Sequence, residues 1–194
     1  MRVRFPTWSW IVCFALLLSP VFGQKAPKRS PDVHWEPTPK EVVTEMLKLA
    51  GVKNDDVVYD LGCGDGRIVI AAAAEFGARG VGIDIDPQRI AESLENAKKA
   101  GVTRRVDFRE EDLFEADIRD ATVVTLFLWP SLNLKLRPKL LSDLKPGTRV
   151  VSYIHDMGDW PAERTVEVGW RRIHLWTIPA ESRGATPNVP EGRN

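Results

Sequence analysis

The feature that most restricts the fold of this chain is the segment Asp60-Leu-Gly-Cys-Gly-Asp-Gly66. It closes an apolar run at residues 56–61, which is typical of a buried β-strand, and precedes an alanine-rich stretch at 67–76, which favours a helix. Glycines at such a junction let the backbone turn sharply and let a ligand approach without meeting a Cβ atom. Ligands of open parallel sheets bind beyond the carboxyl ends of the strands. The segment therefore predicts a ligand site, and a tight turn that binds nothing is the plainer alternative.

Strands and helices alternate over the rest of the chain. One helix begins near Thr38-Pro39-Lys40-Glu41, which matches a capping box with proline at the first helical position. Asp86 precedes Pro87 and predicts the N-cap of another helix, which ends at Gly101. Further strands are predicted at residues 80–83, 106–109, 121–128, 148–154, 165–168 and 172–178, and a last helix at 131–144, which Pro138 kinks or restarts.

The order of these elements predicts an α/β fold. Strands that alternate with helices favour a doubly wound, mostly parallel sheet, here of seven strands with helices on both faces. The last two strands are joined by a short turn without a helix, which predicts an antiparallel pair at the edge of the sheet. A chain of 194 residues is long enough for one such domain with a proper core.

The N-terminal residues differ from the domain. Arg2 and Arg4 precede an apolar run at residues 10–18, and small residues follow as far as Gly23. This pattern predicts a signal peptide over residues 1–23, with an uncleaved membrane anchor as the alternative. We therefore expect an exported or membrane-associated protein. Basic residues also follow the run, so an anchor that faces the cytoplasm stays open.

The remaining organisation follows from composition. Residues 24–36 are polar and proline-bearing and predict a linker, residues 37–180 form the predicted domain, and residues 181–194 predict a disordered tail. The 27 basic and 27 acidic residues balance, so we expect no nucleic-acid partner, and we expect a monomer. Cys63 is the only thiol after cleavage, and His34, His155 and His174 are scattered, so no metal site is expected.

The spacing of the glycines and the acidic residues around them indicate the ligand. Dinucleotide-binding loops read G-x-G-x-x-G and place a helix N-terminus against a pyrophosphate, whereas the spacing here is G-x-G-x-G. Asp60 and Asp65 suit a cationic ligand and oppose a pyrophosphate. S-adenosylmethionine carries an ammonium and a sulfonium and has no phosphate. It is therefore the predicted cofactor.

Carboxylates at the ends of the next two strands complete the predicted cofactor site. Asp84 ends the second strand, where a carboxylate accepts hydrogen bonds from ribose hydroxyls. Asp112 follows the third strand and can accept from the adenine amino group, while Leu113 offers apolar contact to the ring. The predicted cofactor-binding residues are Asp60, Gly62, Gly64, Asp84, Asp112 and Leu113.

These motifs and several others resemble one group of enzymes. The matching segments are Glu36-Pro-Thr-Pro39, Asp60 to Ile68, Glu115-Ala-Asp-Ile118, Ala121-Thr-Val-Val-Thr125, Asn133 to Leu144 and Leu144 to Ser152. Over residues 33–179 the chain resembles the small archaeal protein-lysine methyltransferases. It also resembles the mitochondrial lysine methyltransferases that act on the ATP synthase c subunit and the adenine nucleotide translocase. The resemblance implies a class I, Rossmann-like fold, S-adenosylmethionine bound at the residues named above, and a lysine acceptor.

The chain departs from these relatives around the expected substrate mouth, at Trp129-Pro-Ser131 and Tyr153-Ile-His-Asp156. Candidates to line the mouth are Trp35, Trp129, Ser131, Asn133, His155 and Asp156, of which Trp129, Asn133 and His155 are the candidate catalytic residues, His155 as general base. The plainer interpretation is that the tryptophans are core residues and that the histidine is solvated.

Two other functions stay open at this point. Transfer to a small molecule is one, and a non-catalytic S-adenosylmethionine-binding module at the membrane or outside it is the other. The segment Leu128-Trp-Pro-Ser131 lacks the Asn/Asp-Pro-Pro-aromatic box of enzymes that methylate amino groups of bases, which disfavours nucleic-acid methylation.

Overall fold

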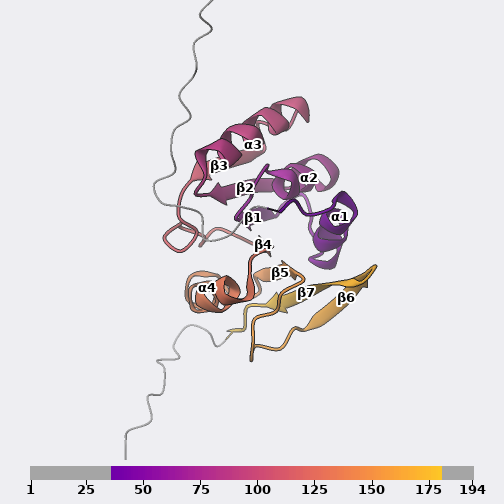
Figure 1. The fold of residues 1–194 in the computed structure, drawn as a ribbon, viewed down its shortest axis with the longest axis vertical. Helices are drawn as coiled ribbons and strands as arrows, with labels where there is room; N and C mark the ends of the chain where they lie inside the picture. Colours follow the sequence, from indigo (N-terminus) through magenta and orange to yellow (C-terminus); the bar gives the residue numbers. More distant parts are fainter. Residues whose placement is uncertain (1–35, 181–194) are drawn as a thin grey trace, which may run out of the picture.

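The computed structural model describes residues 36–180, and within them a single sheet of seven strands is flanked by helices (Figure 1). The predicted signal segment at residues 1–23, nearly all of the linker and the tail at residues 181–194 lie outside the described residues. Within residues 36–180, no helix is both long enough and apolar enough to span a bilayer.

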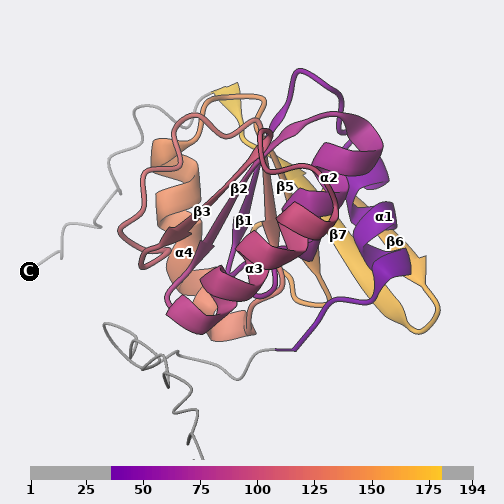
Figure 2. The same ribbon diagram turned by 90° about the horizontal axis from the view of Figure 1, so that it is seen from above.

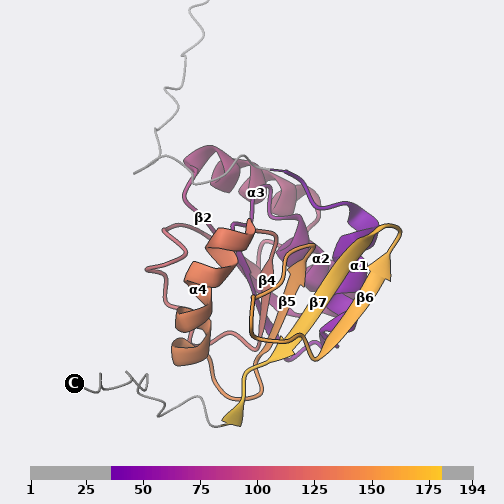
Figure 3. The same ribbon diagram turned by 60° about the horizontal axis from the view of Figure 1, so that its bottom comes forward.

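The sheet has a parallel part and an antiparallel edge. Its strands are β1 (Val57–Leu61), β2 (Arg79–Asp84), β3 (Val106–Glu110), β4 (Val123–Leu126), β5 (Arg149–Tyr153), β6 (Arg164–Val168) and β7 (Arg171–Thr177). Their order is β3-β2-β1-β4-β5-β7-β6; β1 to β5 are parallel, and β7 runs antiparallel to both β5 and β6 (Figure 3). This confirms the predicted sheet. The chain reverses its direction of winding between β1 and β4, the place where open α/β sheets bind ligands.

The four helices divide three to one between the faces. Helices α1 (Lys40–Leu49), α2 (Arg67–Phe76) and α3 (Pro87–Lys99) cover one face, and α4 (Pro130–Asp143) covers the other (Figure 2). Successive residues of β1 point to opposite faces, so Val58 packs beneath the first three helices and Tyr59 on the side of α4. Both faces are therefore covered, as the apolar strands predict.

The connection between β3 and β4 replaces a helix on the face of α4. Residues 111–122 contain no helix, because Asp112 and Asp117 fold their own backbone into turns by accepting from the amides of Phe114 and Arg119. Ile118 in this connection is fully buried against the sheet. This loop thus covers part of the α4 face of the sheet, as the crossover helices cover the sheet at the other parallel connections.

Two local predictions were wrong. Thr38 does not cap α1, because the helix begins at Lys40 and Pro39 takes the N-cap position without a side-chain hydrogen bond. Thr38 is instead buried, and its carbonyl oxygen accepts a hydrogen bond from Arg67 Nη1 at 2.7 Å. The fourth strand spans only residues 123–126 of the apolar run at 121–128, because the chain leaves the sheet toward the cavity described below. Helix α4 continues through Pro138 as one helix, so of the two predicted effects of this proline, a kink or a restart, the restart does not occur.

The predicted cap of α3 is confirmed and can be tested. Asp86 Oδ1 accepts from the Gln88 amide at 2.8 Å. We expect Asp86→Ala to destabilise the fold by about 1 kcal/mol and to lower Tm by roughly 2–4 °C. Asp86→Asn keeps the acceptor and should leave Tm near the wild-type value. Thermal unfolding of both, with Glu95→Ala as a control on the exposed face of α3, would refute the cap if all three gave the same Tm.

Candidate functional site

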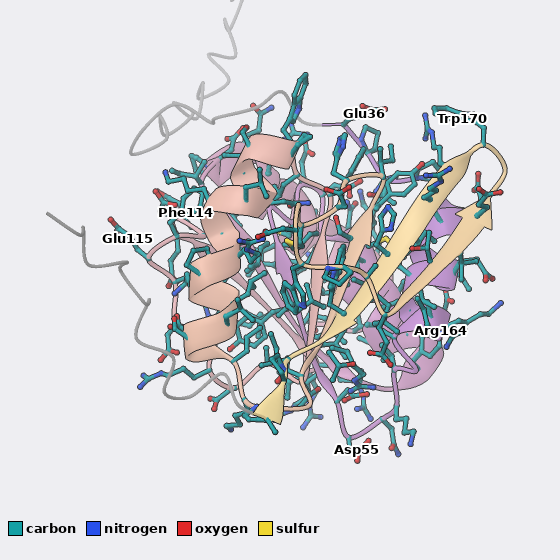
Figure 4. All side chains as sticks on the ribbon, turned by 90° about the horizontal axis from the view of Figure 1, so that it is seen from below. Glu36, Asp55, Phe114, Glu115, Arg164 and Trp170 are labelled. Carbon is teal, nitrogen blue, oxygen red and sulfur yellow. The ribbon has the colours of Figure 1, made fainter. Side chains whose placement is uncertain are left out.

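A cavity of about 730 Å³ opens beyond the carboxyl ends of the parallel strands. Its size suits a small organic ligand, since such sites commonly measure about 300–1,000 Å³. Figure 4 shows Glu36, which lines it, at the opposite edge of the molecule from Asp55, which precedes β1. The lining comprises Glu36, Pro37, Thr38, Asp60, Gly62, Cys63, Asp65, Arg67, Ile68, Asp84, Ile85, Asp86, Arg89, Glu111, Asp112, Leu113, Phe127, Leu128, Trp129, Leu132, Ile154 and His155.

The glycine loop between β1 and α2 requires its glycines. Gly62, Gly64 and Gly66 have φ of +86°, +54° and +78°, a region that residues with a Cβ atom rarely adopt. A Cβ on Gly66 would also lie 2.7 Å from Phe108 Cε1, and one on Gly62 would lie 3.0 Å from Leu128 Cδ2. Its conformation and packing therefore depend on glycine, and Gly62, Cys63 and Asp65 of the loop line the cavity.

Asp60 is a buried carboxylate at the floor of the cavity. It is 3% exposed, and its Oδ1 accepts from Thr125 Oγ1 at 2.7 Å. Burial raises its pKa to about 7; the bond from Thr125 opposes this rise, and the charges of Asp84 and Asp65 add to it. A cation bound nearby would favour the ionised form. Asp60 is thus a buried carboxylate whose ionised form a positively charged ligand would stabilise.

Asp65 does not have the role that its position suggested. Arg67 donates to both carboxylate oxygens of Asp65, from Nε to Oδ1 at 2.8 Å and from Nη2 to Oδ2 at 2.6 Å. Burial alone would raise the pKa of Asp65, but these bonds and the charge of Arg67 lower it. Its charge is therefore neutralised within the protein, which corrects the prediction that Asp65 serves a cationic ligand. Arg67 also donates a hydrogen bond to the carbonyl oxygen of Thr38, so it connects residues 36–38 to the glycine loop on the same side of the cavity.

Asp84 fixes the loop as well as facing the cavity. Its Oδ2 accepts from the Gly64 amide at 2.9 Å and its Oδ1 from the Asp86 amide at 3.0 Å. Burial raises its pKa despite these two bonds. A carboxylate has about four acceptor positions, so these two bonds do not exhaust its capacity to bind a ligand. Gly64 does not line the cavity; its amide instead orients Asp84.

Asp112 and Leu113 both line the cavity, at its β3 side. The carboxylate of Asp112 accepts from the Phe114 amide at 3.0 Å, which fixes its orientation. The neighbouring Glu111 also lines the cavity, and its amide donates to the Asp84 carbonyl oxygen at 3.1 Å. The end of β3 is thereby held against the end of β2.

The candidates at the substrate mouth separate in the structure. Trp129 is 61% exposed and His155 half-buried, and both line the cavity. Burial lowers the pKa of His155, with His174 adding to this and Asp156 opposing it. Asn133 is fully buried and does not line the cavity. Ser131 and Asp156 are exposed outside the lining, and Trp35 lies outside the described residues.

Several lining residues were missed by sequence reasoning. Glu36 was assigned to the linker, and Phe127 was assigned to a buried strand. In the sequence, Phe127 stands at the end of the fourth strand and Glu36 in the proline-rich segment before the first helix. Neither position by itself indicates a place on the cavity, because that place depends on tertiary contacts. Among residues 36–180, no three His, Cys, Asp or Glu side chains are grouped so as to hold a metal ion.

The charge of the cavity is strongly one-sided. Its acidic lining residues are Glu36, Asp60, Asp65, Asp84, Asp86, Glu111 and Asp112. The arginines of the lining are Arg67 and Arg89, and both are paired, with Asp65 and with Glu92. The cavity therefore attracts cations and repels phosphates.

Comparison with known proteins agrees with this geometry. A family model described as the ANTKMT methyltransferase domain matches residues 60–164. A protein-lysine N-methyltransferase of Saccharolobus islandicus is 49% identical over 139 residues, which are 71% of this chain and 86% of that protein. The chain belongs to this methyltransferase family. It is an S-adenosylmethionine-dependent methyltransferase of class I fold, as the resemblance implied.

Two further relatives of this methyltransferase differ in what their names state. The adenine nucleotide translocase lysine N-methyltransferase of Mus musculus is 32% identical over 174 residues, 89% of this chain and 73% of that protein. A solved structure from Salinibacter ruber, described as an RNA methyltransferase in complex with S-adenosyl-L-homocysteine, is 59% identical, with a TM-score of 0.75, and covers 75% of this chain and 95% of its own. The names of these relatives therefore disagree on the methyl acceptor.

Proposed function

We propose that this methyltransferase transfers its methyl group to lysine side chains of proteins. The observation that carries the proposal is the acidic cavity, whose arginines are all paired with carboxylates. Such a cavity attracts a lysine ammonium group. Relatives named as lysine methyltransferases support the same acceptor.

RNA is the second candidate acceptor, because the Salinibacter ruber protein is described as an RNA methyltransferase. Proteins that bind RNA neutralise phosphates with lysine and arginine. Around this cavity the surplus charge is negative, and the whole chain has no net positive charge. Electrostatics therefore favour lysine over a polyphosphate.

The cofactor fits the cavity through its carboxylates and its glycine loop. We assign the ammonium group of S-adenosylmethionine to Asp60, the ribose hydroxyls to Asp84, and the adenine amino group to Asp112, with Leu113 against the ring. Gly62 permits close approach because no Cβ stands there. Gly64 contributes through its bond to Asp84.

The acceptor side is apolar and contains one imidazole. The cofactor supplies a methyl group on a positively charged sulfur, so the protein chiefly has to align a neutral amine with it. Trp129, Leu132 and Phe127 line this side and would partly desolvate the lysine, which lowers the pKa of its ammonium group. His155, whose pKa is lowered by burial, is neutral near pH 7 and can accept a hydrogen bond from the amine.

Labelled S-adenosylmethionine and a cell extract test the acceptor class. Portions of the product are treated with protease or with ribonuclease before precipitation. The proposal predicts that protease releases the label and that ribonuclease does not. The opposite pattern would establish RNA, label only in the small-molecule fraction would establish a small acceptor, and binding without transfer would show a non-catalytic module.

The raised pKa of Asp60 predicts a pH dependence of cofactor affinity. The ammonium group binds the ionised carboxylate, so a proton must leave Asp60 whenever the pH lies below about 7. The Kd for S-adenosylmethionine should therefore rise about tenfold between pH 8 and pH 6. Calorimetric titration measures this, with Asp60→Asn as the control that removes the titrating group. Equal slopes in the wild type and in Asp60→Asn would refute the assignment.

We also propose that residues 1–23 export the protein or attach it to a membrane, and that the domain is a monomer. The basic start and apolar run of that segment support the first statement. Fractionation of cells that express the full chain, or a chain lacking residues 1–23, tests localisation. Recovery of both forms in the same soluble fraction would contradict it. Sedimentation of the chain lacking residues 1–23 tests the monomer.

A further inference from the structure

The loop after β5 contains a strained backbone turn at the edge of the cavity. Ile154 has φ of +69°, and among residues 36–180 it is the only residue other than glycine with a positive φ. The amide of His155 donates to the carbonyl oxygen of Tyr153 at 2.9 Å and closes a γ-turn around Ile154. Positive φ is especially unfavourable for a β-branched residue, so surrounding contacts must hold this turn.

Hydrogen bonds from two sides hold the turn. On the side of β7, the Ile154 amide donates to Arg172 O at 2.7 Å, and Ile154 O lies 3.3 Å from His174 Nε2. On the side of α4, Asn133 Nδ2 lies 3.2 Å from both His155 O and Asp156 O. The backbone of the turn is thus fixed between a strand and a helix.

Packing alone does not account for Asn133. The side chain is 0% exposed, and its Oδ1 is buried without a hydrogen-bond partner among the described residues. An apolar side chain would avoid this unpaired oxygen. What Asn133 provides is its Nδ2 group, which also donates to Ser152 Oγ at 3.2 Å.

The turn determines which side chains form the acceptor side of the cavity. Ile154 and His155 both line the cavity next to Phe127, whose ring lies 4.7 Å from that of Tyr153. If the turn relaxed to negative φ, both side chains would be redirected. We propose that Asn133 and His174 are positioning residues that hold the Tyr153–His155 turn and thereby shape the acceptor subsite.

This proposal rests on the proposed function, since its test measures KM for a protein acceptor. Asn133→Ala is expected to raise that KM roughly tenfold, the effect of about 1.4 kcal/mol lost from positioning, while Kd for S-adenosylmethionine changes less than about twofold. Ser152→Ala is the matched control, because it removes a neighbouring partner of Asn133 and leaves the turn carbonyls bonded. It should leave KM unchanged.

Relief of the strain gives a second, independent arm. In Ile154→Gly the positive φ carries no penalty, so adding Asn133→Ala to that variant should raise KM by less than it does in the wild type. His174→Phe removes the other bond and keeps the ring, and it should raise the acceptor KM in the same way as Asn133→Ala.

Two outcomes would overturn the positioning role. One is an equal loss of cofactor and acceptor binding in Asn133→Ala, which would indicate only a structural role. The other is an Asn133→Ala effect of the same size with and without Ile154→Gly. If a protein were not the acceptor, the wild type would show no labelled protein at all, which separates that failure from this one.

Discussion

Replacing Asp84 by alanine is expected to weaken S-adenosylmethionine binding by roughly 100-fold or more, and to reduce methyl transfer with it. The carboxylate lines the cavity, and we assign two ribose hydroxyls to it. Hydrogen bonds to a charged group contribute about 1.5–3 kcal/mol each, and 1.4 kcal/mol is tenfold in affinity. The variant also releases the amides of Gly64 and Asp86, which loosens the glycine loop.

The matched control for this variant is Asp107→Ala. Asp107 is an exposed carboxylate on the adjacent strand β3 and bonds Arg109 rather than the cavity. Calorimetric titration of both purified variants should give a near wild-type Kd for Asp107→Ala alone. A Kd for Asp84→Ala within about threefold of the control would show that the ribose is held elsewhere.

The second large effect concerns stability. Gly66→Ala is expected to destabilise the fold by about 2–5 kcal/mol, because it combines a left-handed backbone with overpacking. The added Cβ would lie 2.7 Å from Phe108 Cε1 and 2.9 Å from Ser93 Cβ. Phe108 is buried on β3, so it has little room to move. For a domain of this size, Tm should fall by roughly 5–15 °C.

Gly101→Ala separates the two causes. Gly101 has a similar φ of +72°, but a Cβ there meets nothing within 4 Å. It should therefore lose only about 1–2 kcal/mol from the backbone term. Thermal unfolding that gave the two variants equal Tm values would show that the packing around Gly66 is unimportant.

The fold and the carboxylates that line the cavity at the strand ends were predictable because their signals are local. The glycine loop must stand at a strand-to-helix turn, and Asp84 must end the next strand, so the parallel sheet brings them to one edge. The bond from the Gly64 amide to Asp84 follows from that geometry. Likewise, Asp86 before Pro87 is a cap whose partner lies two residues away.

On the acceptor side, Trp129 and His155 were expected at the mouth and line the cavity, but the backbone turn beside them could not be predicted, because it depends on contacts between distant residues. Nothing in the neighbourhood of Ile154 indicates a positive φ, which is maintained by residues on α4 and β7. Asn133 was a predicted candidate because of where its segment stands in the chain. Its burial could not be predicted, because burial depends on how α4 packs. The ion pair in which Arg67 neutralises Asp65 could have been predicted, since only one residue separates the two in the sequence.

The identity of the methylated residue decides whether this enzyme acts on lysine. Protein labelled by the wild-type enzyme, with Asp84→Ala as the inactive control, is hydrolysed in acid and its amino acids are separated. If the enzyme methylates lysine, the label elutes as methylated lysine and is lost in the control. Label in other amino acids, or only in methylated nucleosides of a parallel RNA digest, would contradict it.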